Sequence, residues 1–290
     1  MHPDASPTYA SFPDALQDLP GIVLNAGTAG HAFVAAQGAQ LLSWRAADGR
    51  ERMYLSATTG GLTRSGGEAA AIRGGVPVCF PQFSDRGTLT KHGFVRNLAW
   101  QLNEHTATTL ELRLHDGAAS REQWPHAFEA WLSVRLEPGS LELTLTIINT
   151  GGTPFSFSTA LHTYLRVEDV RQVQLLGLQD VRYQDATDNC MVKTQKEAHL
   201  SIPGEVDRVY IDPPDQLQLL EPGCAPLRIS QRGFADTVVW NPGPDKARAL
   251  VDMPDQDWLH MLCVEAACAK TPVTLAPGRM WEGSQRFSLD

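Results

Sequence analysis

A single glutamate interrupts a long apolar run near the carboxyl end of the sequence. Glu265 lies within WLHMLCVEAACA, residues 258–269, and strand alternation would place it on the same face as Met261 and Cys263. An unpaired buried carboxylate is energetically unfavourable, so such groups usually have a partner or a function. Glu265 is therefore the first candidate for a functional group, with a structural ion pair as the alternative.

His162 in the segment STALHTYLRV, residues 158–167, is the second candidate. Imidazole titrates near pH 6.5, so a histidine can donate or accept a proton close to neutrality. A lone histidine among apolar neighbours is more often a packed core or rim residue. The segment alone leaves both interpretations open.

Arg73, His92 and Arg96 are further candidates, and all three lie in IRGGVPVCFPQFSDRGTLTKHGFVRNLAW, residues 72–100. The glycines and prolines around them predict a strand-and-turn segment that forms one lip of a cleft, with these side chains pointing inward. Surface arginines without a ligand are the commoner alternative.

Two further segments supply residues that suit a polar cleft. Asp207 lies beside Arg208 in EVDRVYID, residues 205–212, where an exposed charge pair in a turn is the simpler interpretation. Trp240 in VVWNPGPDKA, residues 238–247, offers an aromatic face that could stack on a sugar ring, although core packing is the commoner use of tryptophan.

The sequence lacks the short motifs of several large enzyme classes. It has no GxGxxG after a predicted strand, no GxxxxGK[ST], no HExxH and no GxSxG. The nine histidines form no HxH pair with a downstream glutamate on one strand. What remains is a site without a metal, built from arginine, histidine, aspartate and glutamate.

Short strands must position these side chains, because period-two hydrophobicity recurs along the chain. The alternation is clearest in residues 128–136 and 141–147, which the Pro138-Gly139 turn joins as a hairpin. Further strands are predicted at residues 31–44, 94–102, 107–115, 225–231, 235–240, 258–267 and 283–289. Helices are predicted only at residues 13–18, 120–124 with Ser120 as the N-cap, and 245–251.

None of these helices is long enough for the crossovers of a parallel sheet. The predicted fold class is therefore all-β, a large antiparallel β-sandwich with a few short helices. No repeat, low-complexity linker or composition break marks a second domain. We expect a loosely ordered N-terminal segment over residues 1–20 and a single β-sandwich domain over residues 21–290.

The amino-acid composition limits the classes of partner that the protein can bind. Hydrophobic residues make up 42% of the chain and charged residues 20%, which is enough for a sizeable core. The net charge of −9 argues against a nucleic-acid or anionic-membrane surface, so an anionic ligand needs a local cationic pocket. No segment has signal-peptide or membrane-spanning character. The five cysteines form no CxxC pair and predict reduced thiols in a cytoplasmic protein.

Six motifs, in their order and spacing, resemble the glucose-6-phosphate 1-epimerases, the hexose-phosphate mutarotase branch of the aldose 1-epimerase superfamily. They are IRGGVPVCFPQF, KHGFVRNLAW, ALHTYLRV, EVDRVY, VVWNP and HMLCVEAA, and the resemblance covers about residues 21–289. It implies a galactose mutarotase-like supersandwich with an open central cleft and neither metal nor cofactor. The implied partner is a small-molecule substrate, a hexose phosphate, and we expect a monomer or weak dimer.

The same resemblance implies roles for residues within these motifs. His162 matches the general acid and Glu265 the general base. The expected substrate-binding residues are Arg73, Gln82, His92, Arg96, Asp207 and Trp240, with Arg73 and Arg96 as the phosphate partners.

Anomer interconversion of D-glucose 6-phosphate suits these residues. The C1 hydroxyl must lose a proton while the ring oxygen gains one, so a base and an acid must flank the hemiacetal. The ring then opens, the C1–C2 bond rotates and the ring recloses. The alternatives are an aldose 1-epimerase of unphosphorylated sugars, a glycoside hydrolase that uses Asp207 and Glu265, and a non-catalytic carbohydrate-binding β-sandwich.

Overall fold

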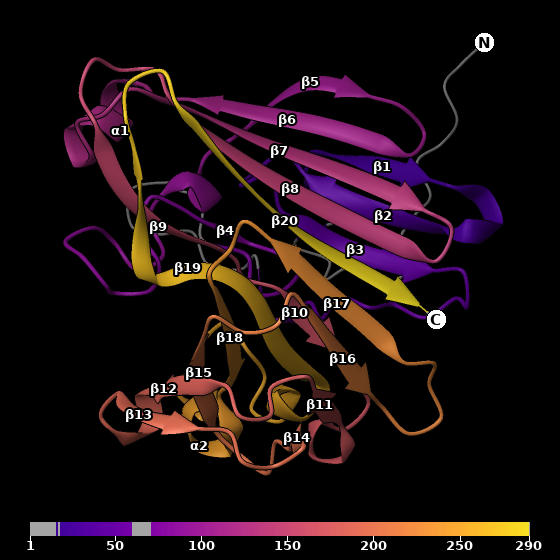
Figure 1. Ribbon diagram of the computed structural model, residues 1–290. Helices are drawn as coiled ribbons and strands as arrows, with labels where there is room; N and C mark the ends of the chain where they lie inside the picture. Colours follow the sequence, from indigo (N-terminus) through magenta and orange to yellow (C-terminus); the bar gives the residue numbers. More distant parts are fainter. Residues whose placement is uncertain (1–15, 17, 60–70, 290) are drawn as a thin grey trace.

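The protein is represented by a computed structural model that describes residue 16, residues 18–59 and residues 71–289 (Figure 1). Most of the helix expected at residues 13–18, and most of the N-terminal segment expected over residues 1–20, lie outside this part of the chain. Within it, no helix is long and apolar enough to cross a membrane.

Nine strands form the larger sheet, and all its neighbouring strands are antiparallel. In spatial order they are β14 (His199–Leu200), β11 (Gln174–Leu176), β16 (Gln216–Leu220), β17 (Leu227–Arg232), β20 (Met280–Leu289), β8 (Ser140–Asn149), β7 (Phe128–Glu137), β6 (Thr109–His115) and β5 (Gln101–His105). Strands β5 to β8 and β20 cross the upper part of Figure 1.

The eight-stranded sheet contains the strands that build the cavity described below. Its order is β13 (Met191–Thr194), β12 (Arg182–Asp185), β15 (Val206–Ile211), β18 (Asp236–Asn241), β19 (Met261–Leu275), β9 (Phe155–Leu161) and β4 (Val78–Cys79), with β10 (Tyr164–Arg166) also paired to β19. A third sheet consists of β1 (Gly21–Asn25), β2 (Gly30–Ala35) and β3 (Leu41–Ala46). Strands β12, β13 and β15 lie at the bottom of Figure 1.

Helices are few and short, so the predicted fold class is confirmed. The described residues form two α-helices, α1 (Ala118–Gln123) and α2 (Gly243–Arg248). They also form the 3-10 turns η2 (Gly27–Ala29), η3 (Val95–Asn97), η4 (Val170–Gln172), η5 (Ala186–Asp188) and η6 (Asp257–His260). Ser120 is not the N-cap of α1. Gly117 holds that position, and the Ser120 hydroxyl accepts a hydrogen bond from its N–H.

The hairpin of β7 and β8 follows the predicted alternation. Ala130, Leu132 and Val134 are buried, whereas the residues between them are partly exposed. Leu132 lies opposite Leu145 in the register, so the buried faces of the two strands coincide. Hydrophobic alternation was sufficient to predict these strands because each buries only one face.

Three of the predicted strands contain a turn that the hydrophobic pattern did not show. Residues 31–44 form β2 and β3 because the chain turns at Gly38, whose φ of 68° is left-handed and whose added Cβ would lie 2.6 Å from the Arg96 carbonyl oxygen. Residues 94–102 form η3 before β5 begins at Gln101. The strand predicted at 258–267 begins only at Met261, after η6.

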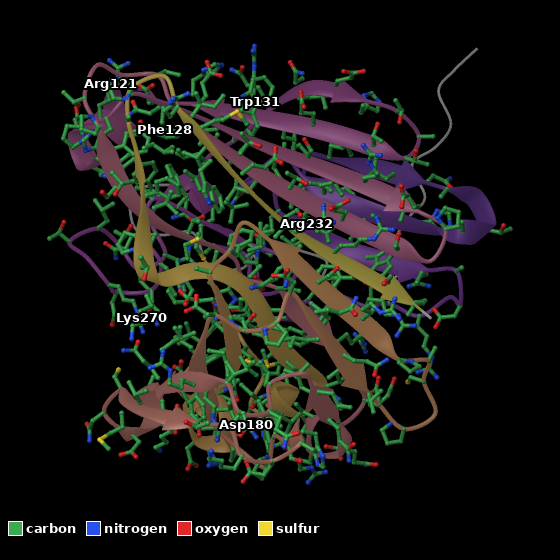
Figure 2. All side chains as sticks on the ribbon, in the orientation of Figure 1. Arg121, Phe128, Trp131, Asp180, Arg232 and Lys270 are labelled. Atoms are coloured by element: carbon green, nitrogen blue, oxygen red, sulfur yellow. The ribbon has the colours of Figure 1, made fainter. Side chains whose placement is uncertain are left out.

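Side chains fill the space between the large sheets (Figure 2). Phe128 and Phe80 are fully buried there with ring centroids 5.2 Å apart, and Trp44 packs 6.1 Å from Phe287. A second, smaller apolar cluster consists of Cys79, Phe83, Ala160, Val209, Val238, Ala267 and Ala269. This cluster joins β4, β9, β15, β18 and β19, and so fixes the strands that carry the candidate site.

Candidate active site

Three central strands of the eight-stranded sheet carry acidic and aromatic residues of one cavity. Glu265 is on β19, Trp240 on β18 and Asp207 on β15. In the sheet register Glu265 lies opposite Val238, and Asp207 lies opposite Trp240. Antiparallel pairing therefore brings together residues that are far apart in the sequence.

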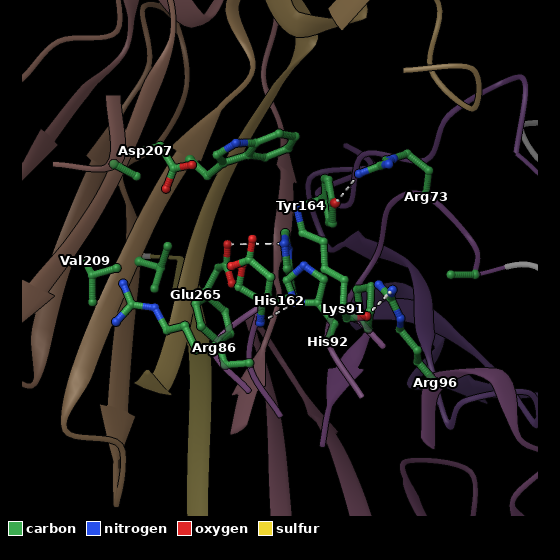
Figure 3. A pocket seen from close by; sticks show the side chains of 18 of the residues that line it. Arg73, Arg86, Lys91, His92, Arg96, His162, Tyr164, Asp207, Val209 and Glu265 are labelled. Carbon is green, nitrogen blue, oxygen red and sulfur yellow. Dashed lines mark hydrogen bonds and ion pairs between the residues drawn. The ribbon is translucent and has the colours of Figure 1, made fainter. Parts of the chain in front are cut away.

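The cavity has a volume of about 960 Å³ and a strongly charged lining (Figure 3). Its basic side chains are Arg73, Arg86, Lys91, Arg96 and Lys246. Its acidic side chains are Asp85, Asp207, Asp252 and Glu265. His92 and His162 also line the cavity. A concave site of this size with convergent polar groups is typical of small-ligand binding.

His162 and Glu265 lie in direct contact on the cavity wall. His162 immediately follows β9, which pairs with β19, and its Nε2 is 3.4 Å from Glu265 Oε1. The exposed fractions are 7% for His162 and 1% for Glu265. Among the described residues, neither His162 Nδ1 nor Glu265 Oε2 has a hydrogen-bond partner. Both groups therefore keep an unused polar atom inside the protein.

Burial drives both members of this pair toward their neutral forms. Desolvation raises the pKa of Glu265 well above its usual value, with a further increase from Asp207 and a decrease from Lys91. Desolvation, with help from Arg73 and Arg96, lowers the pKa of His162 to about 3. Reference values alone indicate an ionised Glu265 at neutral pH. The structure instead favours a neutral carboxylic acid beside a neutral imidazole, with one proton between the two groups.

His92 is a fixed hydrogen-bond donor. Its Nδ1 accepts a hydrogen bond from the Ser84 N–H at 3.2 Å and lies 3.2 Å from Cys79 Sγ. An accepting Nδ1 carries no proton, so the proton of the neutral ring is on Nε2. Burial lowers the pKa of His92 far below its usual value, with His162 and Arg96 contributing. The ring packs edge-on against His162, with centroids 5.1 Å apart.

Arg73 is held in place by two groups. Its Nε and Nη2 donate to the Asp252 carboxylate at 3.1 and 3.0 Å, and its Nη1 donates to the Tyr164 hydroxyl at 3.0 Å. Tyr164 in turn stacks on His162, with ring centroids 4.8 Å apart and an interplanar angle of 13°. The Arg73 guanidinium is thus positioned, and its charge is already balanced by one carboxylate.

The remaining predicted residues line other parts of the cavity. Arg96 donates from Nη2 to the Lys91 carbonyl oxygen at 2.9 Å. Asp207 lies 3.9 Å from Lys246 Nζ, and burial raises the pKa of its carboxyl. Trp240 packs edge-on against His162, with centroids 6.2 Å apart. Its ring is partly exposed and borders the histidine that contacts Glu265.

Gln82 is the predicted residue that the structure does not bring to the cavity surface. Its side chain is 4% exposed and is absent from the cavity lining. Its Nε2 donates to the carbonyl oxygens of Ser84 and Leu89, and its Oε1 accepts from the Leu89 N–H at 2.9 Å. The physical reason is that both polar atoms of its side chain bond to the backbone of the following loop. Gln82 supports the loop that carries Arg86 and Lys91.

Among the cavity residues that sequence reasoning missed are Arg86, Lys91, Tyr164 and Asp252. Two of them had a local signal, because Lys91 precedes His92 directly and Tyr164 is two residues after His162. Asp252 had none. It lies 179 positions from Arg73 in the sequence, and only the folded chain joins them.

One group of side chains in this site has the spacing to hold a metal ion. Ligand atoms of His162, Cys263 and Glu265 all lie within 4.8 Å of one another, and all three residues are buried. The site expected from the sequence contains no metal, and the acid and base roles expected of the pair do not require one.

The chain is similar in sequence to a known family and to curated proteins. The aldose 1-epimerase family model matches residues 20–288. A protein from Cenchrus ciliaris, provisionally named glucose-6-phosphate 1-epimerase, is 36% identical over 262 residues, which are 85% of this chain and 77% of the relative. A protein from Escherichia coli with the same provisional name is 33% identical over 245 residues, 82% of this chain and 80% of the relative.

Solved structures share the fold. A provisionally named mutarotase from Salmonella typhimurium superposes with a TM-score of 0.80 at 27% identity, covering 94% of this chain and 97% of that one. A galactose mutarotase-like protein from Lactobacillus casei has a TM-score of 0.75 at 15% identity. The superposition covers 93% of this chain and 100% of that protein. With the family match over nearly its whole length, the chain belongs to the aldose 1-epimerase family and is an isomerase.

Proposed function

We propose that the protein interconverts the α and β anomers of a hexose 6-phosphate, with D-glucose 6-phosphate as the first substrate to test. The observation that carries the proposal is the buried contact between His162 Nε2 and Glu265 Oε1, 3.4 Å apart in a cavity lined by basic side chains. The provisional name shared by the curated relatives supports the choice of substrate.

In the proposed mechanism the pair works with a single shared proton. When substrate binds, Glu265 is the carboxylate and His162 the imidazolium, because the dianionic phosphate opposes the loss of the imidazolium proton. Glu265 accepts the proton of the C1 hydroxyl while His162 donates its proton to the ring oxygen. The C1–O5 bond breaks and the aldehyde forms. The pair is then a neutral acid and a neutral imidazole, which is the state that burial favours.

Rotation about the C1–C2 bond presents the other face of the aldehyde, and reclosure reverses both transfers. Glu265 returns its proton to the carbonyl oxygen, His162 recovers its proton from the C5 hydroxyl, and the C1–O5 bond forms again. The starting state of the pair is restored. We assign Asp207, Trp240 and the Nε2–H of His92 to holding the sugar, because all three residues border the same cavity.

The phosphate is assigned to the basic lip of the cavity. Arg96 and Arg73 are its proposed partners, and Lys91 and Arg86 join them because they line the same cavity. Arg73 already forms an ion pair with Asp252, so we assign it the smaller share of the phosphate charge. Lys91 influences the pKa of both Glu265 and His162, which supports a position of its ammonium close to the pair.

Magnetisation-exchange NMR tests the proposal on the wild-type protein. The anomeric signals of glucose 6-phosphate, mannose 6-phosphate, glucose and galactose are measured in turn, with and without protein. Faster exchange for the two phosphates than for the free sugars is the expected result. Faster exchange for the free sugars alone would identify an aldose 1-epimerase of unphosphorylated substrates. Exchange equal to that in buffer for all four would reject both.

A cytoplasmic location is part of the same proposal. All five cysteines are free, and Cys190 is exposed to solvent. Free thiols persist in reducing compartments, where disulfides are rare.

A further inference from the structure

A buried thiol beside the His162–Glu265 pair takes no part in the proposed reaction. Cys263 lies two residues before Glu265 on β19, on the same face of the strand, and its exposed fraction is 0%. Ligand atoms of Cys263, Glu265 and His162 all lie within 4.8 Å of one another. A thiol, a carboxylate and an imidazole are together the donor set of a zinc-like ion.

The distances suit tetrahedral coordination. With Zn–N and Zn–O bonds of about 2.0–2.1 Å, two such ligands of a tetrahedron are about 3.4 Å apart. The separation of His162 Nε2 from Glu265 Oε1 is 3.4 Å. A Zn–S bond of about 2.3 Å places a thiolate about 3.6 Å from the other two donors, so Cys263 Sγ has to approach by at most about 1.2 Å from its present limit of 4.8 Å.

The charges also balance. A divalent cation bound to the Cys263 thiolate, the Glu265 carboxylate and neutral His162 forms a complex with no net charge. Such a complex can be buried without an uncompensated ion. Glu265 Oε2, which has no hydrogen-bond partner among the described residues, is available as an acceptor for the ion or for a water bound to it. The open cavity supplies the fourth position.

We propose that His162, Cys263 and Glu265 form an inhibitory site for a borderline-soft divalent cation, with Zn²⁺ and Co²⁺ as its probes. The ion replaces the thiol proton of Cys263 and the carboxylic-acid proton of Glu265, both of which leave to the buffer, and it occupies the Nε2 lone pair of His162. Inhibition rests on the proposed function, because it requires that His162 and Glu265 transfer the protons. Binding of the ion does not depend on that function. Mg²⁺ and Ca²⁺ prefer all-oxygen sites and do not compete.

A Co²⁺ titration followed by optical absorption tests the binding directly. The background protein carries Cys190→Ser and Cys224→Ser, because these two thiols are the more exposed ones. We expect one Co²⁺ per chain, with visible bands of tetrahedral Co²⁺ and a near-ultraviolet thiolate-to-cobalt band. Cys263→Ser, which is close to isosteric, should remove the thiolate band, and Cys263→Ala provides a second variant if the first does not fold.

Cys268→Ala is the matched control, because Cys268 is also a buried thiol on β19 but is not part of the group. It should retain the band. A thiolate band that survives in Cys263→Ser, or a background protein that binds no Co²⁺, would overturn the proposed site.

Anomer exchange in the presence of Zn²⁺ tests the inhibition. Each protein is compared with its own metal-free rate. Zn²⁺ should lower the exchange rate of the background protein at least about 10-fold, and EDTA should restore that rate. Mg²⁺ should leave the rate unchanged. The Zn²⁺ concentration for half-inhibition should rise at least about 10-fold in Cys263→Ser. A Co²⁺ thiolate band without inhibition would keep the metal site but reject proton transfer by this pair, so the two proposals fail separately.

Discussion

Glu265 of β19 and His162, which follows β9, lie in contact in a buried part of the cavity wall, and each is more stable there without charge. A water-like environment would leave Glu265 ionised at neutral pH. The protein removes water, so burial favours the neutral acid beside the neutral imidazole over the ion pair. Proton transfer between these residues then changes no net charge inside the protein. This balance suits a reaction that runs equally in both directions.

Glu265→Gln keeps the shape of the side chain and removes the base. The expected result is a loss of roughly 10²–10⁴-fold in anomer exchange, the usual contribution of a positioned acid–base group. Sugar-phosphate affinity, measured by titration calorimetry, should change little. Exchange at the wild-type rate would remove Glu265 from the chemistry.

The lowered pKa of His162 predicts a pH dependence of stability. The folded-state pKa of about 3 lies below the unfolded value of 6.5, so the stabilising contribution is fully present above pH 6.5 and is lost as the pH falls. Between about pH 6.5 and 5 the free energy of unfolding falls by roughly 2 kcal/mol through this group. Glu265, with its raised pKa, acts in the opposite direction.

Urea unfolding of wild type and His162→Gln at about pH 7 and about pH 5 measures this effect. The wild type should lose more free energy of unfolding than the variant, because Gln has no group to protonate. Identical losses in both proteins would mean that His162 is protonated as easily in the fold as in water.

Arg96→Ala should weaken the binding of glucose 6-phosphate much more than the binding of glucose. A hydrogen bond to a charged group contributes about 1.5–3 kcal/mol, which corresponds to roughly a 10- to 100-fold rise in KM for the phosphate. Arg135→Ala is the control, because this exposed residue of β7 is not part of the cavity lining and the change of charge is the same. Equal effects of Arg96→Ala on both sugars would assign Arg96 to the scaffold.

At the scale of elements, loop geometry decides where the basic side chains lie. Gly93 follows His92, has a φ of 71°, and an added Cβ would lie 2.1 Å from the Phe80 carbonyl oxygen. Only glycine fits such a position. The side chain of Gln82 bonds to the backbone of Ser84 and Leu89, and so fixes the loop that precedes His92. The turn-rich segment is therefore a rigid support for the cavity lip.

Two glycine variants separate strain from steric clash. Gly139 also has a left-handed φ, 73°, but open space around its added Cβ. Gly139→Ala should cost about 1 kcal/mol of stability from backbone strain alone. Gly93→Ala combines strain and clash and should cost at least about 3 kcal/mol, as measured by urea unfolding. Similar costs for both would show that the loop at Gly93 relaxes.

Local patterns predicted the elements well where one face of a strand is buried and poorly where a turn interrupts the pattern. The β7–β8 hairpin matches because its alternation is regular. The break between β2 and β3 was missed because the approach of Gly38 to the Arg96 backbone is a tertiary contact. The same contact helps to place η3, which carries Arg96.

At the scale of the whole molecule, we propose that residues 21–290 form one domain. The two large sheets share one continuous apolar core, in which Phe157 of β9 packs on Trp281 of β20. One cooperative urea transition, coincident by circular dichroism and tryptophan fluorescence, is the expected result. Analytical ultracentrifugation should find a monomer or a weak dimer. Two separated transitions would divide the chain into independent units.

The sequence by itself determined the fold class and the chemical inventory of the site. Alternating hydrophobicity is a local property, so it identified an all-β fold, and motif order pointed to His162 and Glu265. The tertiary structure alone decided their neutral forms, the ion pair of Arg73 with Asp252, the removal of Gln82 from the cavity surface and the position of Cys263 beside the pair. The physical reason is that pKa values, ion pairs and metal geometry depend on burial and on distances between residues far apart in the chain, and these arise only when the strands pair.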